Sequence, residues 1–516
     1  MPIIQLPKPD LHQIHKEDSI NDRDKSKPWR YGITREIAIN LEKGQWVDLP
    51  EAGGRLWRIG VHSPNAMNIS INFDAFQLPN GGKLQLFSPD GSDFSKAYTG
   101  ADNTPTKRLG SWFINSDTVY IEYFQPETVT QMPVIKINSL IHGYRMGAVA
   151  RYLNGPNKGL NDSGSCNYDV NCSVGEDYEG RKNLIKKTVA LLNLGNGYLC
   201  SAALLNTTKN DKTPYLLTAN HCLENSDPSL WSVRFNWVSP NPVCGSASNS
   251  ADIASNFTMS GTAVRANSAL TDFALVELVN AIPENWDIAF AGWDRTDAHP
   301  SYEVSLHHPK GDIMKIARDN TGAVKEIANG TPVWLIGGVS AGVGNGWEIG
   351  TTESGSSGAP LFDQNGRVIG QLHGGKSSCD GTQNNGDYDV FGRFGVSWDG
   401  GGQPENSLSD WLDPLNSGLA VTETLQNILN VNDNQTLGRL QIYPNPASTA
   451  ITVMNNRYPK LSYRMFTLLG QEVSQGLLYN TLNTIDVKLL SEGIYFLHLS
   501  DGDTGSTMTE RIVVSH

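Results

Sequence analysis

The chain has 516 residues, of which 18% are charged and 39% hydrophobic. This composition is typical of folded proteins, and at roughly 100–200 residues per domain the length indicates about three domains. The formal net charge of -13 disfavours a nucleic-acid partner, which requires a basic face. No apolar run reaches the roughly eighteen residues of a membrane helix, so we expect no membrane span.

All six cysteines lie between Cys166 and Cys379. They show no metal-ligand spacing, so we expect three disulfides formed outside the reducing cytosol. The first residues, MPIIQLPKPDLHQIHKEDSINDRDK, lack the apolar stretch of a secretory signal. We therefore expect a secreted or cell-surface protein whose signal peptide is missing here because the chain is truncated or mis-started.

The first half of the chain predicts a β domain preceded by a lead-in. Residues 1–33 are polar without clear periodicity, and we expect them to be poorly ordered. Residues 34–150 alternate apolar runs such as RLWRIGV and TVYIEYF with turn signals such as PNGG, which is typical of a β-sandwich. Residues 151–160 continue as a Gly- and Asn-rich linker.

The second half predicts two further β domains. Residues 161–416 contain strand-like runs such as PYLLTA and FALVEL, and one short helix is expected in LSDWLDP. A linker over residues 417–436 leads to residues 437–516, where regularly spaced short strands predict a small second β-sandwich. The predicted fold class is therefore all-β.

A glycine-flanked serine is the first candidate for catalysis. In ESGSSGAP, Ser357 sits on a tight turn that can expose its hydroxyl. The backbone N–H groups of Gly355 and Ser357 would form an oxyanion hole beside this nucleophile. Loops of this composition are usually only turns, so the motif needs partners elsewhere in the chain.

Two further segments supply those partners. In YLLTANHC, His221 follows an apolar strand and can serve as the base that activates a serine. In SALTDFALVEL, Asp272 precedes a strand and can hold the tautomer of that base. The order His221, Asp272, Ser357 is that of chymotrypsin-like enzymes and differs from subtilisin and α/β-hydrolases.

Together with SGSCNYDV, AGWDR, LHHP, GQLHGGKSSC and LSDWLDP, these motifs resemble the bacterial lysyl endopeptidase family. The resemblance covers residues from about 160 to 416 and implies a chymotrypsin-like double β-barrel. Sequence alone leaves fifteen cysteine pairings open. The family resemblance implies three of them: Cys166–Cys379, Cys172–Cys244 and Cys200–Cys222.

The charge that selects the substrate is expected in an unusual position. Trypsin-like enzymes carry an aspartate six residues before the nucleophile, where this chain has Thr351. The family resemblance implies instead the aspartate of DVFGR, Asp389, with Asp387 as its rival. A buried carboxylate requires a charged partner, so we expect lysine before the scissile bond. The preference between lysine and arginine stays open, because it depends on the depth of the pocket.

The segment QLHGG is expected to line the substrate cleft. The resemblance places His373 there, with Trp334 as a stacking partner, although Trp334 can equally be a core residue. Gly374 and Gly375 would let a substrate backbone approach closely. The neighbouring His307 and His308 point to opposite faces of a strand, so we expect a structural role, with no metal site and no cofactor.

The sandwich over residues 34–150 is expected to be a propeptide, with a binding module as the alternative. Lys158 lies in the linker, so a lysine-specific enzyme would cut the Lys158–Gly159 bond itself. Ser356 replaces the aspartate used in trypsin-type activation, so activation would require removal of the sandwich.

The last domain carries YPNPAS, LLGQEV, LLSEGIYFLHL and RIVVS. This ordered set resembles the C-terminal sorting domain of the type IX secretion system of Bacteroidetes, with a small adhesive sandwich as the alternative. The expected partners are polypeptide substrates and the type IX secretion machinery. The sequence thus predicts a secreted, lysine-preferring serine endopeptidase. The alternatives are a β-rich adhesion protein on a protease scaffold, or a serine protease of different preference.

Overall fold

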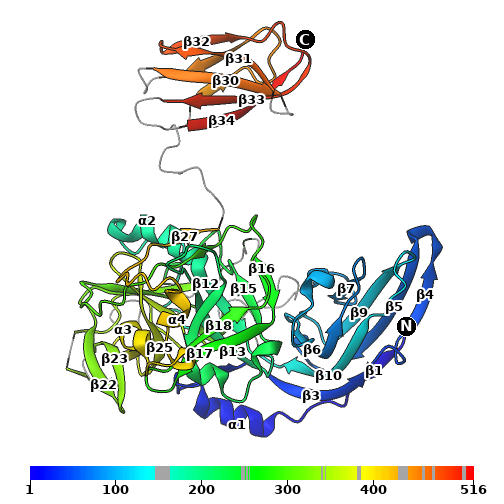
Figure 1. The fold of residues 1–516 in the computed structure, drawn as a ribbon, viewed down its shortest axis with the longest axis vertical. Helices are drawn as coiled ribbons and strands as arrows, with labels where there is room; N and C mark the ends of the chain where they lie inside the picture. Colours follow the sequence, from blue (N-terminus) through cyan, green and yellow to red (C-terminus); the bar gives the residue numbers. More distant parts are fainter. Residues whose placement is uncertain are drawn as a thin grey trace. The chain divides into compact units, whose positions relative to one another are not determined.

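The chain divides into two compact units, Met1–Ile428 and Leu429–His516, and strands are the main regular structure of both (Figure 1). A computed structural model describes residues 1–145, 163–245, 250, 254, 256–338, 341–342, 344–379, 385–427, 440–455, 460–467, 471–501 and 507–516. The predicted all-β fold class, with a double-barrel protease flanked by two sandwiches, is confirmed.

The N-terminal sandwich packs two sheets face to face. One contains β1 (Ile3–Gln5), β4 (Gln45–Leu49), β5 (Gly54–His62), β7 (Lys83–Phe87) and β9 (Thr118–Pro126). The other contains β3 (Gly32–Ile39), β6 (Asn68–Gln77), β8 (Leu109–Gly110) and β10 (Val134–Gly143). Buried and partly exposed residues alternate along β9, so Val119, Ile121 and Tyr123 enter the core.

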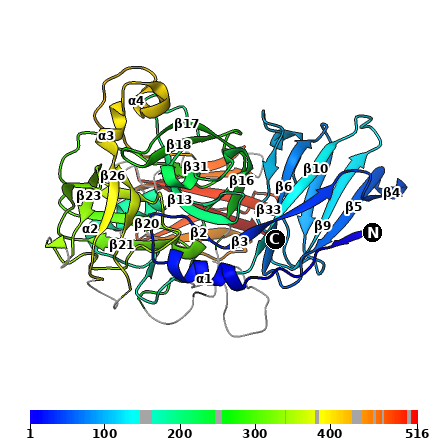
Figure 2. The same ribbon diagram turned by 90° about the horizontal axis from the view of Figure 1, so that it is seen from below.

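The first residues of the chain are built into this unit, and the expectation of a poorly ordered lead-in does not describe them. β1 pairs with β5 of the sandwich, and α1 (His12–Asn21) follows. β2 (Trp29–Arg30) then pairs with a strand of the first protease barrel. In Figures 1 and 2 this dark blue segment passes along the protease strands. The lead-in is ordered by its pairing with strands of the sandwich and of the protease region, although its sequence shows no periodicity that predicts a strand.

The first barrel-like sheet of the protease region contains eight strands, including β2. The others are β12 (Val189–Asn193), β13 (Tyr198–Leu205), β14 (Tyr215–Ala219), β15 (Ser232–Phe235), β16 (Phe257–Ser260), β17 (Thr262–Ser268) and β18 (Phe273–Leu278). β14 and β18 are antiparallel, with Ala219 opposite Phe273. This register brings the residues after β14 close to those before β18.

The second barrel-like sheet also has eight strands. They are β11 (Tyr168–Asp169), β20 (Glu303–His307), β21 (Lys315–Asp319), β22 (Val324–Ala328), β23 (Thr331–Ile336), β24 (Pro360–Asp363), β25 (Val368–Gly375) and β26 (Asp389–Arg393). A shared core joins residues of both sheets and includes Trp293, which stacks on Phe394. The two barrels therefore hold their facing loops at a common seam.

The protease region also contains the short helices α2 (Glu176–Ile185), α3 (Phe394–Asp399) and α4 (Ser409–Leu412). The helix predicted in LSDWLDP is confirmed as α4. A two-stranded ribbon of β19 (Ala289–Phe290) and β27 (Leu425–Gln426) closes the unit. Within the described residues, none of the helices combines the length and apolarity needed to cross a bilayer.

The C-terminal unit is a small two-sheet sandwich. One sheet contains β28 (Gln441–Tyr443), β29 (Ala450–Met454) and β32 (Leu482–Asp486), and the other β30 (Leu461–Thr467), β31 (Glu472–Leu478), β33 (Gly493–Ser500) and β34 (Thr507–Val514). Its core includes Ile451, Val453, Leu497 and Leu499. The alternation in the terminal RIVVS motif buries Ile512 and Val514, as a half-buried strand requires.

Candidate active site

The structure brings His221 and Asp272 into direct contact at the ends of β14 and β18. Nδ1 of His221 donates to Oδ2 of Asp272 over 2.7 Å, and the backbone N–H of His221 donates to Oδ1 over 2.9 Å. Burial acts to raise the pKa of Asp272, but hydrogen bonds from His221 and His373 outweigh it, so the pKa lies below its usual value. The carboxylate is therefore held ionised and fixes the imidazole.

His373 contacts the same carboxylate from the second barrel. Its Nδ1 donates to Oδ2 of Asp272 over 2.7 Å, and its ring lies edge-on to that of His221 with centroids 6.4 Å apart. These three residues are also a group whose donor atoms lie within 4.8 Å of one another. The two imidazole donors that converge on one carboxylate account for this clustering without a metal ion.

Ser357 lies in the loop before β24, and Ser201 of β13 holds that loop in place. Ser201 Oγ donates to the carbonyl of Gly355 over 3.1 Å, and the Ser201 N–H donates to the Ser357 carbonyl over 2.8 Å. Gly355 has a φ of +94°, which requires glycine. The sequence analysis missed Ser201. Its position next to Cys200, in a strand beside the candidate base, could have indicated that it lies near the site.

A lysine from the lead-in fills the space beside the candidate nucleophile. The Ser357 hydroxyl donates to the carbonyl oxygens of Lys25 and Lys27, at 3.2 and 3.3 Å. Ser357 is fully buried, and Lys25 is only 4% exposed. The structure therefore shows the site covered by a segment of its own chain.

Five oxygen atoms surround the Lys25 ammonium, and we call this place the ammonium site, formed by Thr352, Ser377 and Asp389. Nζ lies 2.5 Å from Asp389 Oδ1, 2.8 Å from Ser377 Oγ and 3.0 Å from Thr352 Oγ1. The backbone carbonyls of Ser377 and Thr352 lie 2.9 and 3.1 Å away. All three residues are buried, so the ion pair is shielded from water.

The second oxygen of Asp389 is fully occupied by donors of the protein. Oδ2 accepts from Trp347 Nε1 at 2.7 Å, Thr352 Oγ1 at 2.7 Å and Ser377 Oγ at 2.6 Å. Because the two hydroxyl protons point at the carboxylate, their lone pairs face the ammonium. Sequence reasoning missed Trp347, Thr352 and Ser377; Ser377 in KSSC and Thr352 beside ESGSSGAP were available signals.

The two aspartates weighed for this position have different surroundings. Asp389 lies at the start of β26 with no exposed surface and contacts the ammonium of Lys25. The carboxylate of Asp387 accepts from the backbone N–H of Tyr388. Thr351, which replaces the trypsin-type aspartate, lies 2.7 Å from Ser377 through its hydroxyl. Asp389 is therefore the aspartate that lines the ammonium site.

The prediction that Trp334 stacks on His373 is wrong. Trp334 is 1% exposed, packs in a core cluster of the second barrel and donates from Nε1 to the Ile369 carbonyl over 3.0 Å. Its ring lies edge-on to His299, with centroids 5.7 Å apart. β23 directs this side chain into the barrel interior, a choice of face that a strand pattern alone does not settle.

Gly374 and Gly375 each allow a close approach. A Cβ on Gly374 would lie 3.3 Å from the backbone nitrogen of Ser26, so the lead-in backbone runs against this glycine. A Cβ on Gly375 would lie 2.1 Å from Asp389 Oδ1. Gly374 therefore leaves room for an incoming backbone, and Gly375 leaves room for the buried carboxylate.

His307 and His308 bond in different directions. His307 Nδ1 lies 2.7 Å from the hydroxyl of Ser356, and His308 Nδ1 donates to the Asp312 carbonyl over 2.9 Å. Burial lowers the pKa of His308 to about 4. The two rings therefore support the loops around Ser357 as neutral groups.

The three disulfides join the pairs that the family resemblance implies: Cys166–Cys379, Cys172–Cys244 and Cys200–Cys222. The last one connects β13 to the short turn that carries His221. The first one connects the beginning of the protease region to the segment that carries Ser377. The predicted cleavage site, Lys158–Gly159, lies outside the described residues.

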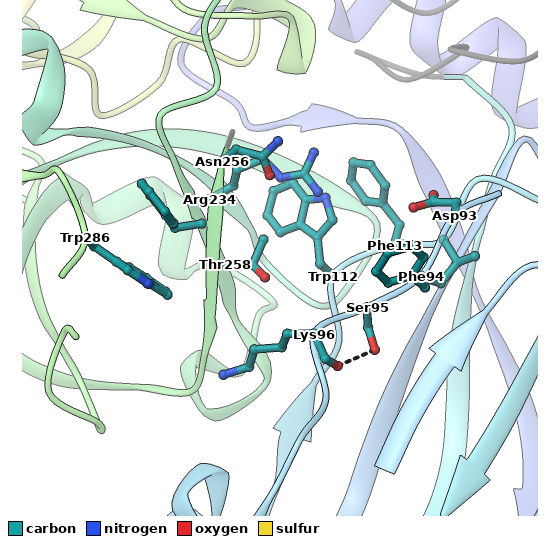
Figure 3. A pocket seen from close by; sticks show the side chains of 12 residues that line it. Asp93, Phe94, Ser95, Lys96, Trp112, Phe113, Arg234, Asn256, Thr258 and Trp286 are labelled. Carbon is teal, nitrogen blue, oxygen red and sulfur yellow. Dashed lines mark hydrogen bonds between the residues drawn. The ribbon is translucent and has the colours of Figure 1, made fainter. Parts of the chain in front are cut away.

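A pocket elsewhere in this unit is lined by the N-terminal sandwich and the first barrel (Figure 3). The Arg234 guanidinium lies 4.3 Å from the ring of Trp112, and Phe257 stacks on Trp286. None of the residues around Ser357 lines this pocket. It marks the seam where the sandwich docks on the protease region.

The fold is a chymotrypsin-like double β-barrel, with His221 and Asp272 in contact at the seam of the two barrels. Residues 160–392 match the family model described as lysyl endopeptidase, C-terminal domain. Residues 441–515 match that of the secretion system C-terminal sorting domain. Both resemblances predicted from the sequence are confirmed, and the first match places this region among proteases.

A lysyl endopeptidase of Pseudomonas aeruginosa is 25% identical over 369 residues, which are 68% of this chain and 76% of that protein. The crystal structure of Deg5 is 14% identical, with a TM-score of 0.22, over 42% of this chain and 88% of that one. PorZ, a surface component of the type IX secretion system of Porphyromonas gingivalis, is 9% identical, with a TM-score of 0.13. The match covers 63% of this chain and 42% of PorZ. At these TM-scores, neither structural likeness bears on the site.

Proposed function

We propose that the chain is a secreted serine endopeptidase that cleaves after lysine. The observation that carries the proposal is the Lys25 ammonium bound by Asp389 at 2.5 Å beside the hydroxyl of Ser357. A lysine side chain held by a carboxylate next to a nucleophile is the arrangement that a lysyl substrate requires. The match of residues 160–392 to the lysyl endopeptidase family supports it.

In this proposal His221 takes the proton of Ser357 as the hydroxyl attacks the scissile carbonyl carbon. The carbonyl oxygen becomes an oxyanion held by the N–H groups of Gly355 and Ser357. The resulting imidazolium is stabilised by Asp272, and it then gives the proton to the leaving amine. Water hydrolyses the acyl-enzyme in the same way and releases the new carboxyl end.

The ammonium site favours lysine over arginine on geometric grounds. Five oxygens converge on Lys25 Nζ within 3.1 Å, which suits a compact ammonium with three donors. A guanidinium is planar and carries its five N–H groups in a wider fork, so it would displace Thr352 or Ser377. Their hydroxyls are held by Asp389, so the displacement would break bonds within the site.

Cleavage-site profiling tests this function. A mixture of peptides is incubated with the full chain and with Lys25→Ala, which leaves the ammonium site free, and the new C-termini are read by mass spectrometry. We expect cuts almost only after lysine, lost in Ser357→Ala and weakened by at least roughly a hundredfold in Asp389→Asn. Absence of hydrolysis by both folded proteins, or equal cleavage after leucine, contradicts the proposal.

The flanking domains give the proposal its cellular setting. The N-terminal sandwich acts as a propeptide that is released by cleavage at Lys158–Gly159, and residues 441–515 direct export through the type IX machinery. N-terminal sequencing of the mature enzyme should then read Gly159. Deletion of residues 437–516 should leave the enzyme inside a type IX-competent host, and secretion of that truncated chain would contradict the export role.

A further inference from the structure

We propose that residues 22–27, named the strap, are a built-in pseudosubstrate that keeps the full-length chain inactive. The inference rests on the proposed lysyl endopeptidase function and concerns the regulation of the same site. Lys25 enters the ammonium site with its Nζ 2.5 Å from Asp389. Because the lysine is 4% exposed and all five oxygens of the site surround its ammonium, no substrate lysine can enter.

The strap also engages the hydroxyl of the candidate nucleophile. The Ser357 hydroxyl has a single proton, and the carbonyl oxygens of Lys25 and Lys27 share it as acceptors. Nε2 of His221 is buried, and none of the described residues forms a hydrogen bond with it. Proton transfer from serine to histidine requires that missing contact. The strap therefore blocks catalysis at the nucleophile as well as at the ammonium site.

The strap is folded as a turn and so differs from a bound substrate. The Lys27 N–H donates to the Asp24 carbonyl over 3.3 Å, and the Ser26 N–H and hydroxyl donate to the Asp24 carboxylate over 3.1 and 2.5 Å. An extended peptide would pair along the edge of the protease sheet. The turn instead presents two carbonyl oxygens to Ser357, which explains how a lysine can occupy the site as an inhibitor.

Both ends of the strap are anchored. Ser354 Oγ donates to the Asp22 carbonyl over 2.8 Å, and the Asp22 carboxylate forms an ion pair with Arg145, next to the end of β10. On the other side, β2 pairs with β13 of the protease. The strap thus spans from the sandwich to the protease, and loss of the sandwich removes one of its two anchors.

Tyr144 strengthens the link between the sandwich and α1. Its hydroxyl donates to the buried carboxylate of Asp18 over 2.7 Å, and the same carboxylate pairs with Arg30. Arg145 in turn donates to the Arg30 carbonyl over 2.7 Å. These contacts join the strap to the sandwich, so the two would inhibit the protease as one unit. Activation would therefore require both to leave the protease together.

The test compares full-length wild type, Lys25→Ala and the matched control Lys27→Ala. Lys27 lies in the same strap, but its side chain is 56% exposed and contacts only Asp24 among its described ion pairs. Two readouts are taken before self-cleavage, with intact mass checked: hydrolysis of a lysyl peptide amide, and modification of Ser357 by diisopropyl fluorophosphate. We expect Lys25→Ala to raise both rates roughly tenfold or more, and Lys27→Ala to match wild type.

The outcomes separate the two proposals. Equal rates in wild type and folded Lys25→Ala overturn the pseudosubstrate and leave the enzyme function standing. Absence of hydrolysis by every folded variant overturns the enzyme function itself. If Lys25→Ala fails to fold by circular dichroism, Lys25→Met keeps the aliphatic stem without the charge, and the same increase is expected. Wild type must also show a lag before hydrolysis, and a linear progress curve from mixing contradicts the inference.

Discussion

The indole N–H of Trp347 donates a 2.7 Å hydrogen bond to Oδ2 of Asp389, while the ammonium of Lys25 contacts Oδ1 of the same carboxylate. The tryptophan thereby fixes the carboxylate in the orientation that receives a positive charge on Oδ1. Neither residue is exposed, so loss of this bond leaves part of a buried charge unsatisfied. The pair makes a direct prediction about substrate selection.

Trp347→Phe should lower kcat/KM for lysyl peptides about tenfold, because the buried carboxylate loses one donor. The control is Trp334→Phe, which removes an indole donor to the Ile369 carbonyl in the core of the same barrel. Both variants should lose stability, but only the first should lose lysine selectivity. Rates on matched lysyl and leucyl substrates measure the difference, and equal loss in both variants contradicts the assignment.

His373 should assist the candidate triad through Asp272. His373→Ala removes the Nδ1 donor that lies 2.7 Å from the carboxylate, and we expect kcat to fall about tenfold with little change in KM. His373→Asn places an amide donor near the same position and should restore most of the rate. If alanine and asparagine behave alike, the hydrogen bond to Asp272 is not what His373 contributes.

Ser201 should act as a positioning residue for the nucleophile loop. Ser201→Ala loses the 3.1 Å bond to the Gly355 carbonyl, so the oxyanion donors move and kcat should fall about tenfold. Ser260→Ala is the matched control, because it also loses a buried hydroxyl bonded to a carbonyl, that of Gly110. Steady-state kinetics should show an unchanged kcat in that control.

His308 predicts how stability depends on pH. Burial lowers its pKa to about 4, whereas in the unfolded chain its pKa is about 6.5. As pH falls from about 6.5 to about 4, the unfolded state takes up a proton that the folded state refuses, so the free energy of unfolding drops by about 3 kcal/mol. Below the pKa of His308 in the folded protein, this residue causes no further decrease in the free energy of unfolding.

His308→Asn keeps a donor for the Asp312 carbonyl and cannot titrate in this range. Calorimetry between pH 7 and pH 4 should therefore show a smaller fall in the melting temperature than in wild type. His307, whose pKa is also lowered by burial, remains and preserves part of the fall. Parallel curves for wild type and His308→Asn would contradict the role of His308.

The sequence predicts most of the candidate site where local motifs are strong. His221 follows β14 and Asp272 precedes β18, and these two strands pair, so the contact between the two residues follows from the order of the strands. Asp389 depends on the family resemblance, since composition alone does not separate it from Asp387. Local patterns therefore predict which loops meet, and the resemblance predicts which carboxylate they enclose.

The remaining features depend on tertiary contacts that no local pattern contains. Trp334 and Trp347 are both buried tryptophans of the second barrel, and only the facing of their strands and loops decides which one bonds to Asp389. Lys25 reaches the same carboxylate across 364 positions of sequence. A lysine in a polar, aperiodic lead-in gives no signal of burial, because its partner lies in a different domain.

The disulfide Cys166–Cys379 spans 213 positions of the chain and closes two residues beyond Ser377. One wall of the ammonium site is thus tied to the start of the protease region by a bond that forms only where thiols are oxidised. In the proposed function, the selection of lysine is in this way coupled to the redox state of the compartment. For the proposed lysyl endopeptidase, we therefore expect a chain in the reducing cytosol to lack the covalent tie that holds this wall of the ammonium site, whether or not the strap is in place.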